Sequence, residues 1–199
     1  MGHFTRRYFL KTSALLAFAT PSLTVKAKGN SPLPLLTLAK QWIAAPEDWI
    51  PNHPSLPVMH FRATNRMPEA QHTVLTRLTH AGWHTQWKSV PFSYQHFHSK
   101  AHAIFVVAAG NGKMQLGGER GEVIHVAQGD LLFLPAGTGQ ILRQSSKDFQ
   151  VLAFYPDGQH WDVCRSSLSA SAQKKQSALP LTRRSRRLFR SMAPAMLKA

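Results

Sequence analysis

Two histidines one residue apart give this chain its clearest chemical signal. His96 and His98 flank Phe97 within Gln95–His98, a segment that we expect to be a strand. Because side chains alternate across a strand, both imidazoles would lie on one face and Phe97 on the other. Two neutral imidazoles side by side make half of a transition-metal site. Buried histidines also occur as purely hydrogen-bonded groups, so the pair predicts a site only together with its surroundings.

The elements around this pair have the pattern of an all-β barrel. Short strand-like runs alternate with glycine-containing breaks, which is typical of sandwiches and barrels. A short amphipathic helix is predicted over 68–83, because Val74, Leu75 and Leu78 share one helical face. The predicted strands are Gln95–His98, Ala103–Ala108, Lys113–Leu116, Val123–Val126, Leu131–Leu134, Ile141–Gln144 and Phe149–Tyr155.

Length and charge place these elements in one domain. The 199 residues suffice for one core, and the formal net charge of +15 comes from the two ends. Residues 1–28 hold five basic residues, residues 174–199 hold eight, and neither stretch holds an acid. The remaining 11 basic and 9 acidic residues nearly balance, so we expect no nucleic-acid partner for the body. The single cysteine, Cys164, excludes an internal disulfide.

The N-terminus predicts export. Residues 5–11 read Thr-Arg-Arg-Tyr-Phe-Leu-Lys, which resembles the twin-arginine signal, and the moderately apolar stretch 12–23 follows. Cleavage is expected near Ala27, which would leave a periplasmic or otherwise exported protein and make the translocase a transient partner. A general secretory signal and a retained membrane anchor are the alternatives. We divide the chain into a signal peptide (1–27), a linker (28–47), the barrel domain (48–165) and a basic, irregular tail (166–199).

The motifs of the barrel region resemble the cupin superfamily. His96, His98, Ala103 and Gly110 follow the spacing of the first cupin motif, and Gly129 begins the second. The resemblance extends over roughly residues 48–165 to an uncharacterised bacterial group, the YjlB-type cupins, and implies a single small jelly-roll-like barrel. The stretches that carry it are Asn52-His53-Pro54, Gly82-Trp83, Trp87, Tyr94, His96–Ser99, His102, Leu116–Gly118, Pro135–Gly139 with Gln140, Asp148-Phe149, Tyr155-Pro156 and Gly158-Gln159.

Two departures from the cupin pattern bear on its chemistry. The resemblance implies a metal held by two His, one Glu and a final His, but Ala103 and Gln140 stand at the last two positions. Alanine has no donor atom, and an amide oxygen is a weak ligand for Fe, Mn, Ni or Zn. His102 is a further weak metal candidate, although strand parity turns it away from His96 and His98 unless a bulge intervenes. His125 and His160 are candidates that the sequence does not place.

The sequence therefore leaves two functions in competition. The first is a small-molecule-binding cupin with a degenerate metal site, in which the ligand contacts His96, His98, Gln140 and Phe105. The second is a metal-dependent enzyme of the dioxygenase or isomerase class that uses His96 and His98. Trp87, Phe92, Phe105 and Phe133 are aromatic residues expected to fill the barrel, some of them walling a ligand pocket.

The tail adds a further hypothesis. Residues 183–190 hold five arginines, which would suit contact with an acidic surface, and a solvated tail is the alternative. Cupins of this type end in an acidic stretch, so a local reading-frame slip is another hypothesis for this departure. By analogy with other cupins, a homodimer through sheet edges is also expected.

Overall fold

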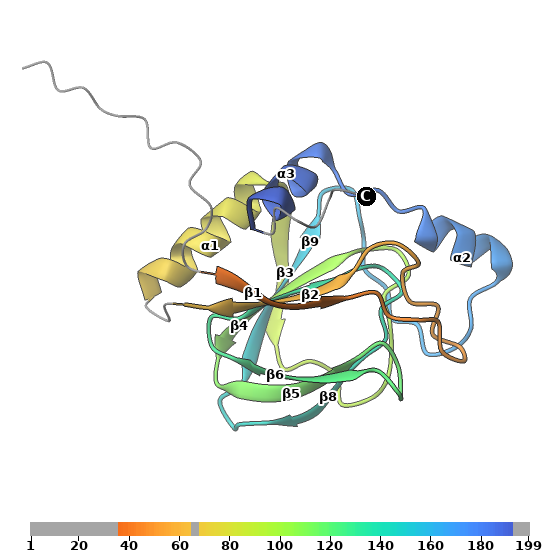
Figure 1. Ribbon diagram of the computed structural model, residues 1–199, viewed down its shortest axis with the longest axis horizontal. Coiled ribbons are helices and arrows are strands. Elements are labelled where there is room, and N and C mark those ends of the chain that lie inside the picture. The colour runs from red at the N-terminus through yellow and green to blue at the C-terminus, as the bar shows by residue number, and fades with distance from the viewer. Residues whose placement is uncertain (1–35, 65–67, 193–199) are drawn as a thin grey trace, which may run out of the picture.

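The computed structural model describes residues 36–64 and 68–192, which form two antiparallel sheets that face each other (Figure 1). The larger sheet has the order β1-β2-β7-β4-β9-β3, and the smaller has the order β6-β5-β8. The predicted all-β architecture with a short helix before the barrel is confirmed. The strands are β1 Leu36–Trp42, β2 Val58–Ala63, β3 Trp83–Ser89, β4 Ala103–Ala109, β5 Asn111–Leu116, β6 Glu122–Ala127, β7 Leu131–Leu134, β8 Gln140–Ser145 and β9 Gln150–Pro156.

The centre of the larger sheet is buried on both faces, as strand β4 shows. Alternation sends Ile104 and Val106 to its outer face, whereas Ala103, Phe105 and Val107 face the smaller sheet. All five side chains are fully buried. The molecule therefore has two cores, an inner one between the sheets and an outer one under the helices.

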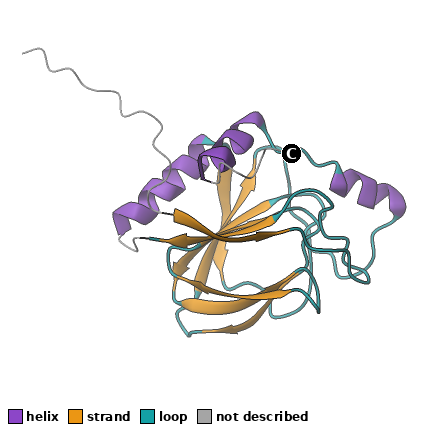
Figure 2. Ribbon diagram, in the orientation of Figure 1, coloured by secondary structure: helices purple, strands orange, loops and turns teal. Residues whose placement is uncertain are grey.

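Helices α1 (Pro68–His80) and α3 (Arg183–Met192) cover the outer face, as Figure 2 shows. Helix α1 packs through Ala70, Val74 and Leu78, which confirms the predicted helix, and it ends three residues earlier than expected. Helix α2 (Ala170–Ser177) lies apart from these two, beside the end of the barrel (Figure 1). No helix within the described ranges is long and apolar enough to cross a membrane.

The structure differs from the expected irregular tail, because residues 166–192 contain α2 and α3. The hydroxyl of Thr182 accepts the N–H of Ser185 at 3.1 Å and caps α3. Ser185, Leu188, Phe189 and Met192 share one helical face, and that face is buried in the outer core. The ring of Phe189 lies 4.4 Å from that of Phe133 between centroids. Phe133, expected inside the barrel, therefore belongs to the outer core.

The N-terminal part of the domain also differs from expectation. Residues 36–42, which we assigned to the linker, form β1 and pair with β2. The expected strand Gln95–His98 is reduced to two single bridges, His96 to Gln140 and Phe97 to Cys164. The predicted signal peptide, residues 1–27, lies outside the described residues.

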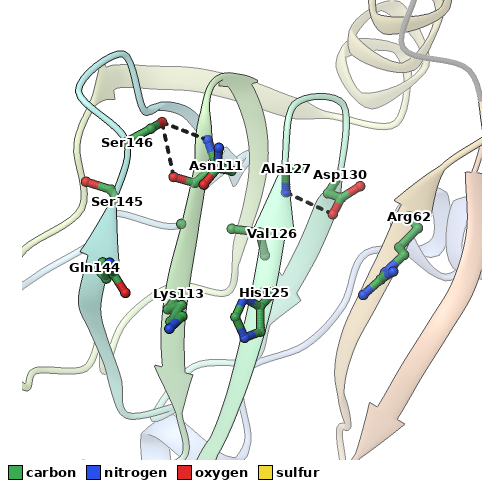
Figure 3. Close-up of a pocket in the computed structure, with 11 residues that line it drawn as sticks. Arg62, Asn111, Lys113, His125, Val126, Ala127, Asp130, Gln144, Ser145 and Ser146 are labelled. Carbon is green, nitrogen blue, oxygen red and sulfur yellow. Dashed lines mark hydrogen bonds between the residues drawn. The ribbon is translucent and has the colours of Figure 1, made fainter.

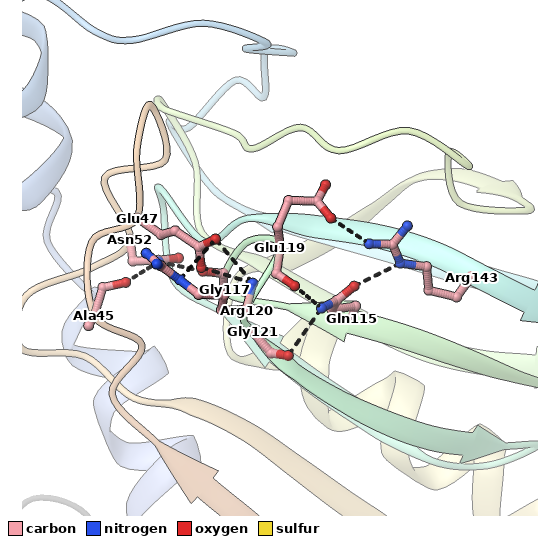
Figure 4. Close-up of polar contacts among 9 residues, drawn as sticks. All are labelled: Ala45, Glu47, Asn52, Gln115, Gly117, Glu119, Arg120, Gly121 and Arg143. Carbon is pink, nitrogen blue, oxygen red and sulfur yellow. Dashed lines mark hydrogen bonds and ion pairs between the residues drawn. The ribbon is translucent and has the colours of Figure 1, made fainter.

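A polar network holds the β5–β6 turn against the loop before β2 (Figure 4). The Asn52 amide donates to the carbonyls of Ala45 and Gly117, at 2.6 and 2.9 Å, and its oxygen accepts the N–H of Gly139 at 3.1 Å. Gly117 has a φ of 104°, which favours glycine. Because Gly139 precedes Gln140, this network fixes where β8 begins.

Candidate functional site

The segment that carries the two histidines is held in place on both sides by backbone hydrogen bonds. His96 exchanges two such bonds with Gln140, at 2.8 and 3.2 Å, and Phe97 exchanges two with Cys164, at 2.9 and 3.1 Å. His96 and His98 both face one cavity, while Phe97 packs on the other side against Trp49. The alternation expected of a strand is thus kept although only two residues are bridged.

This cavity has a volume of about 180 Å³ and lies at the mouth of the barrel. The structure brings together four predicted ligand-binding residues there, His96, His98, Gln140 and Phe105. A cavity of about 150 Å³ holds benzene in another protein, so the space suits a molecule of one ring with a small substituent. The other lining residues are mostly apolar: Trp87, Ser89, Val90, Pro91, Phe92 and Trp161.

The ring of His98 has a defined tautomer because each nitrogen has a partner. Its Nδ1 bonds to the backbone carbonyl of Asp162, which can only accept, so Nδ1 carries the proton. Its Nε2 accepts the hydroxyl of Tyr155 at 3.3 Å, and that hydroxyl accepts the indole N–H of Trp87 at 3.2 Å. Burial lowers the pKa of His98 and raises that of Tyr155, so the ring is neutral and the phenol keeps its proton.

His96 is neutral in the same tautomer but keeps its second nitrogen free. Its Nδ1 donates to the carbonyl of Tyr94 at 3.0 Å, and burial lowers its pKa to about 4. Within the described part of the chain no group bonds to its Nε2. The side-chain oxygen of Gln140 is buried and also has no hydrogen-bond partner there. The cavity therefore offers one unused acceptor, His96 Nε2, beside the buried amide of Gln140, and no lysine or arginine lines it.

The structure does not bring His102 to this pair. Its Nδ1 accepts the N–H of Ala136 at 3.0 Å, and its Nε2 donates to the carbonyl of Leu179 at 3.2 Å. Its ring faces His53 and Phe133, with centroids 5.8 and 6.0 Å away. His102 precedes β4 in an irregular segment, and both of its nitrogens are used by backbone groups, so this weak metal candidate does not join the pair at the cavity. His125 and His160 are exposed.

The residues present do not fit the metal centre that cupin motifs imply. Ala103 offers no donor, and Gln140 offers only a neutral amide. Across residues 36–64 and 68–192, no group of three or more His, Cys, Asp or Glu side chains is placed to hold a metal ion. Two imidazoles, one of them bonded to Tyr155, remain as the donor set, and we derive no chemistry through a metal.

A second cavity of about 470 Å³ lies at the C-terminal end of β8 (Figure 3). The first cavity lies at the other end of this strand, which begins at Gln140. Its polar side chains come from β2, β5, β6 and β8, and they include the cations Arg62 and Lys113 beside the exposed His125. The Asp130 carboxylate accepts hydrogen bonds from the N–H groups of Ala63 and Ala127 and is bonded to the His60 ring, at 3.1 Å each. This groove has no aromatic wall, and its cations would repel a cationic ligand.

Comparison with known proteins identifies the family. Residues 80–198 match the AraC-like ligand binding domain. The chain belongs to this family of cupins. It is 34% identical over 135 residues to the uncharacterised protein YjlB of Bacillus subtilis (strain 168), covering 66% of this chain and 80% of that protein. The match extends to residue 198 and so includes α2 and α3.

Solved structures resemble this AraC-like domain only distantly. RmlC from Streptococcus suis, in complex with dTDP-D-xylose, has a TM-score of 0.33 and 13% identity, over 63% of this chain and 74% of that one. Procruciferin, an 11S globulin from Brassica napus, has a TM-score of 0.33 and 17% identity, over 69% of this chain. The chain spans 31% of that globulin's length. At these TM-scores the structures add no argument about function.

Two residues that shape the site of this AraC-like domain were not predicted from the sequence. Trp161 walls the cavity, and Asp162 holds the histidine segment in place through hydrogen bonds with His98 and Ser99. The carboxylate of Asp162 accepts both the N–H and the hydroxyl of Ser99 at 2.6 Å. Burial raises the pKa of Asp162, but these hydrogen bonds outweigh burial and hold it below its usual value. Burial raises the pKa of the neighbouring Cys164 thiol, which argues against a thiolate nucleophile.

Proposed function

We propose that this AraC-like cupin domain binds a small molecule that has an apolar ring-sized body and a hydroxyl or amine head, and that it does so without a metal. The observation that carries the proposal is His96 Nε2, an acceptor without a partner among the described residues, in an aromatic cavity where the buried Gln140 Oε1 also lacks a hydrogen bond. A buried acceptor without a partner is costly, and a donating ligand removes that cost. An anionic ligand has no cation in the lining to receive it.

A panel of ligands with one ring and different heads tests this assignment. Benzyl alcohol and benzylamine carry donors, benzoate is an anion, and toluene has no polar head. We expect the two donors to bind at least about ten-fold more tightly than benzoate or toluene, as measured by calorimetry and by the shift in melting temperature. Tightest binding of benzoate would contradict the proposal.

Two variants locate the binding. Gln140→Leu keeps the volume of the side chain but removes its acceptor, so it should reduce the affinity for benzyl alcohol by about ten-fold. His125→Ala, in the second cavity, is the matched control and should leave this affinity unchanged. Equal effects of the two variants would show that the ligand does not occupy the cavity of His96 and His98.

Elemental analysis tests the metal-free part of the proposal. Protein purified without a metal-binding tag should contain less than about a tenth of an equivalent of Fe, Mn, Ni or Zn. Stoichiometric metal would instead support the alternative, a metal-dependent enzyme that uses His96 and His98.

We also propose that the protein is exported through the twin-arginine route, on the residue pattern of positions 5–11 and the cleavage position near Ala27. In a bacterial host, the chain should appear in the periplasm shortened by about 27 residues. Arg6→Lys with Arg7→Lys should keep it in the cytoplasm at full length, and an unaltered location would exclude this route. A homodimer through a sheet edge stays a prediction, to be measured by sedimentation.

A further inference from the structure

The outward face of α3 is a row of four arginines. Arg183, Arg186, Arg187 and Arg190 follow the i, i+3, i+4, i+7 spacing of one helical face and surround a hollow of about 300 Å³. No acidic side chain in residues 36–64 and 68–192 forms an ion pair with any of the four. This arginine row is therefore a concentrated positive charge with no internal counterpart in the described structure.

The arrangement works against the stability of the helix. Like charges three and four residues apart repel each other. Arg183 and Arg184 also stand in the first turn, where cations oppose the helix dipole, and that turn has no acid. The opposite face already fixes the helix through buried Leu188, Phe189 and Met192. The fold therefore does not require the arginine row, and an external anion would relieve both kinds of repulsion.

The buried apolar face limits how α3 can meet a partner. An interfacial helix usually inserts its apolar side among lipid chains. Here that side packs on the sheet, and the Trp83 indole N–H donates to the Ser185 hydroxyl at 2.9 Å beneath the helix. Only the charged side is available, so any binding through α3 rests on electrostatic contacts.

We propose that α3 docks this protein on the surface of an anionic phospholipid bilayer, with headgroup phosphates seated among the four arginines. Guanidinium groups bind phosphate oxygens bidentately. A nucleic-acid groove combines cations with exposed aromatic rings, but the aromatic ring of α3, Phe189, is fully buried. The balanced charge of the rest of the body also suits contact through one local patch.

Vesicle flotation of the full chain tests this docking surface. The vesicles contain phosphatidylcholine alone or with about one third phosphatidylglycerol. The variant replaces all four arginines of the row by Gln. Its matched control replaces Lys88, Lys100, Lys113 and Lys147 by Gln, which lowers the net charge equally on other elements. Because the signal segment is present in all three proteins, it affects each of them alike.

We expect the wild type to bind only the anionic vesicles, and to lose that binding as salt rises from about 0.05 to 0.5 M. Each arginine should contribute about a five-fold change, so the row variant should lose at least a hundred-fold in affinity and the control less than about ten-fold. The row variant should melt no lower than the wild type, because removing repulsion does not destabilise α3. Equal losses in both variants, or tighter binding of single-stranded RNA than of anionic vesicles, would overturn the proposal.

Discussion

Two pairs of buried histidines in this barrel look alike until the direction of their hydrogen bonds is compared. The rings of His96 and His98 lie 5.4 Å apart between centroids, and those of His53 and His102 lie 5.8 Å apart. All four are at most 4% exposed, and burial lowers the pKa of each. Burial and pKa therefore do not distinguish the pair at the cavity from the pair outside it.

The position of the ring proton does distinguish them. His96 and His98 donate from Nδ1 to backbone carbonyls, so Nε2 is an acceptor in both rings: in His98 it accepts the Tyr155 hydroxyl, and in His96 it is free for a ligand. His53 and His102 accept backbone N–H groups at Nδ1, so their protons are on Nε2. His102 thus ties distant chain segments together and His53 holds its own turn, with its Nε2 left buried and unpartnered, while His96 keeps an acceptor for a ligand. In this domain the nitrogen that the fixed backbone partner takes decides whether the other ring nitrogen is an acceptor or a donor.

The largest expected effect is on the pH dependence of stability, and it should be similar for histidines of both pairs. His53, His96 and His102 each have a folded pKa of about 4 against an ordinary 6.5. The unfolded chain binds more protons between these values, so stability is fully present above about pH 6.5 and is lost as the pH falls toward 4. Each histidine contributes at most about 3 kcal/mol.

Urea unfolding at several pH values measures this loss. His96→Gln and His102→Gln should each make the free energy of unfolding less dependent on pH in that range. The exposed His125→Gln is the control. A profile that is flat between pH 4 and 6.5 would show that the rings are not held neutral.

A smaller effect, the loss of stability on replacement by alanine, should differ between the two pairs. His102→Ala leaves the N–H of Ala136 and the carbonyl of Leu179 without partners and creates a cavity, so it should lower the free energy of unfolding by about 3 kcal/mol. His96→Ala borders a cavity that already exists and should cost about 1 kcal/mol. Urea unfolding at pH 7 compares the two. If His96→Ala destabilised the protein as much as His102→Ala, both pairs would have the same structural role.

The smallest effect converts the cavity pair into a metal site. Ala103 lies on the inner face of β4 with Phe105, and Gln140 is bridged to His96. Ala103→Glu together with Gln140→His should therefore complete a four-ligand set and raise zinc affinity by at least about ten-fold over the wild type. Calorimetry with zinc measures this, and His125→Ala is the control. Unchanged zinc affinity would mean that these positions do not converge.

The sequence predicts strands β4 to β9 but not β1, β2 and β3, although β2 is an inner and mostly buried strand of the larger sheet. Strands β4 to β9 are rich in buried apolar residues, and their glycine-containing turns are visible in the sequence. Strands β1 and β3 are the edges of the larger sheet, and in Trp83–Ser89 all but the first residue are exposed or half-buried. An edge strand of this kind has no apolar alternation to recognise. In α3 the buried positions 185, 188, 189 and 192 do follow a helical period, but the arginine run obscured it.

The candidate site was predictable in part, from side-chain parity and motif spacing. Parity alone indicates that His96 and His98 share a face, and motif spacing indicates that Gln140 belongs with them. The tautomers depend on the carbonyls of Tyr94 and Asp162, and the position of Asp162 is set by a long-range contact with Ser99. Such backbone partners leave no pattern in the sequence, so the acceptor character of the cavity required the structure.

Nitrogen-15 NMR of the histidine rings tests the central claim most directly, because long-range nitrogen–proton correlations identify which ring nitrogen carries the proton. At pH 7 we expect these four rings to be neutral, with the proton on Nδ1 in His96 and His98 and on Nε2 in His53 and His102. Protons on Nε2 in His96 and His98 would contradict the account, because the cavity would then present donors to its ligand.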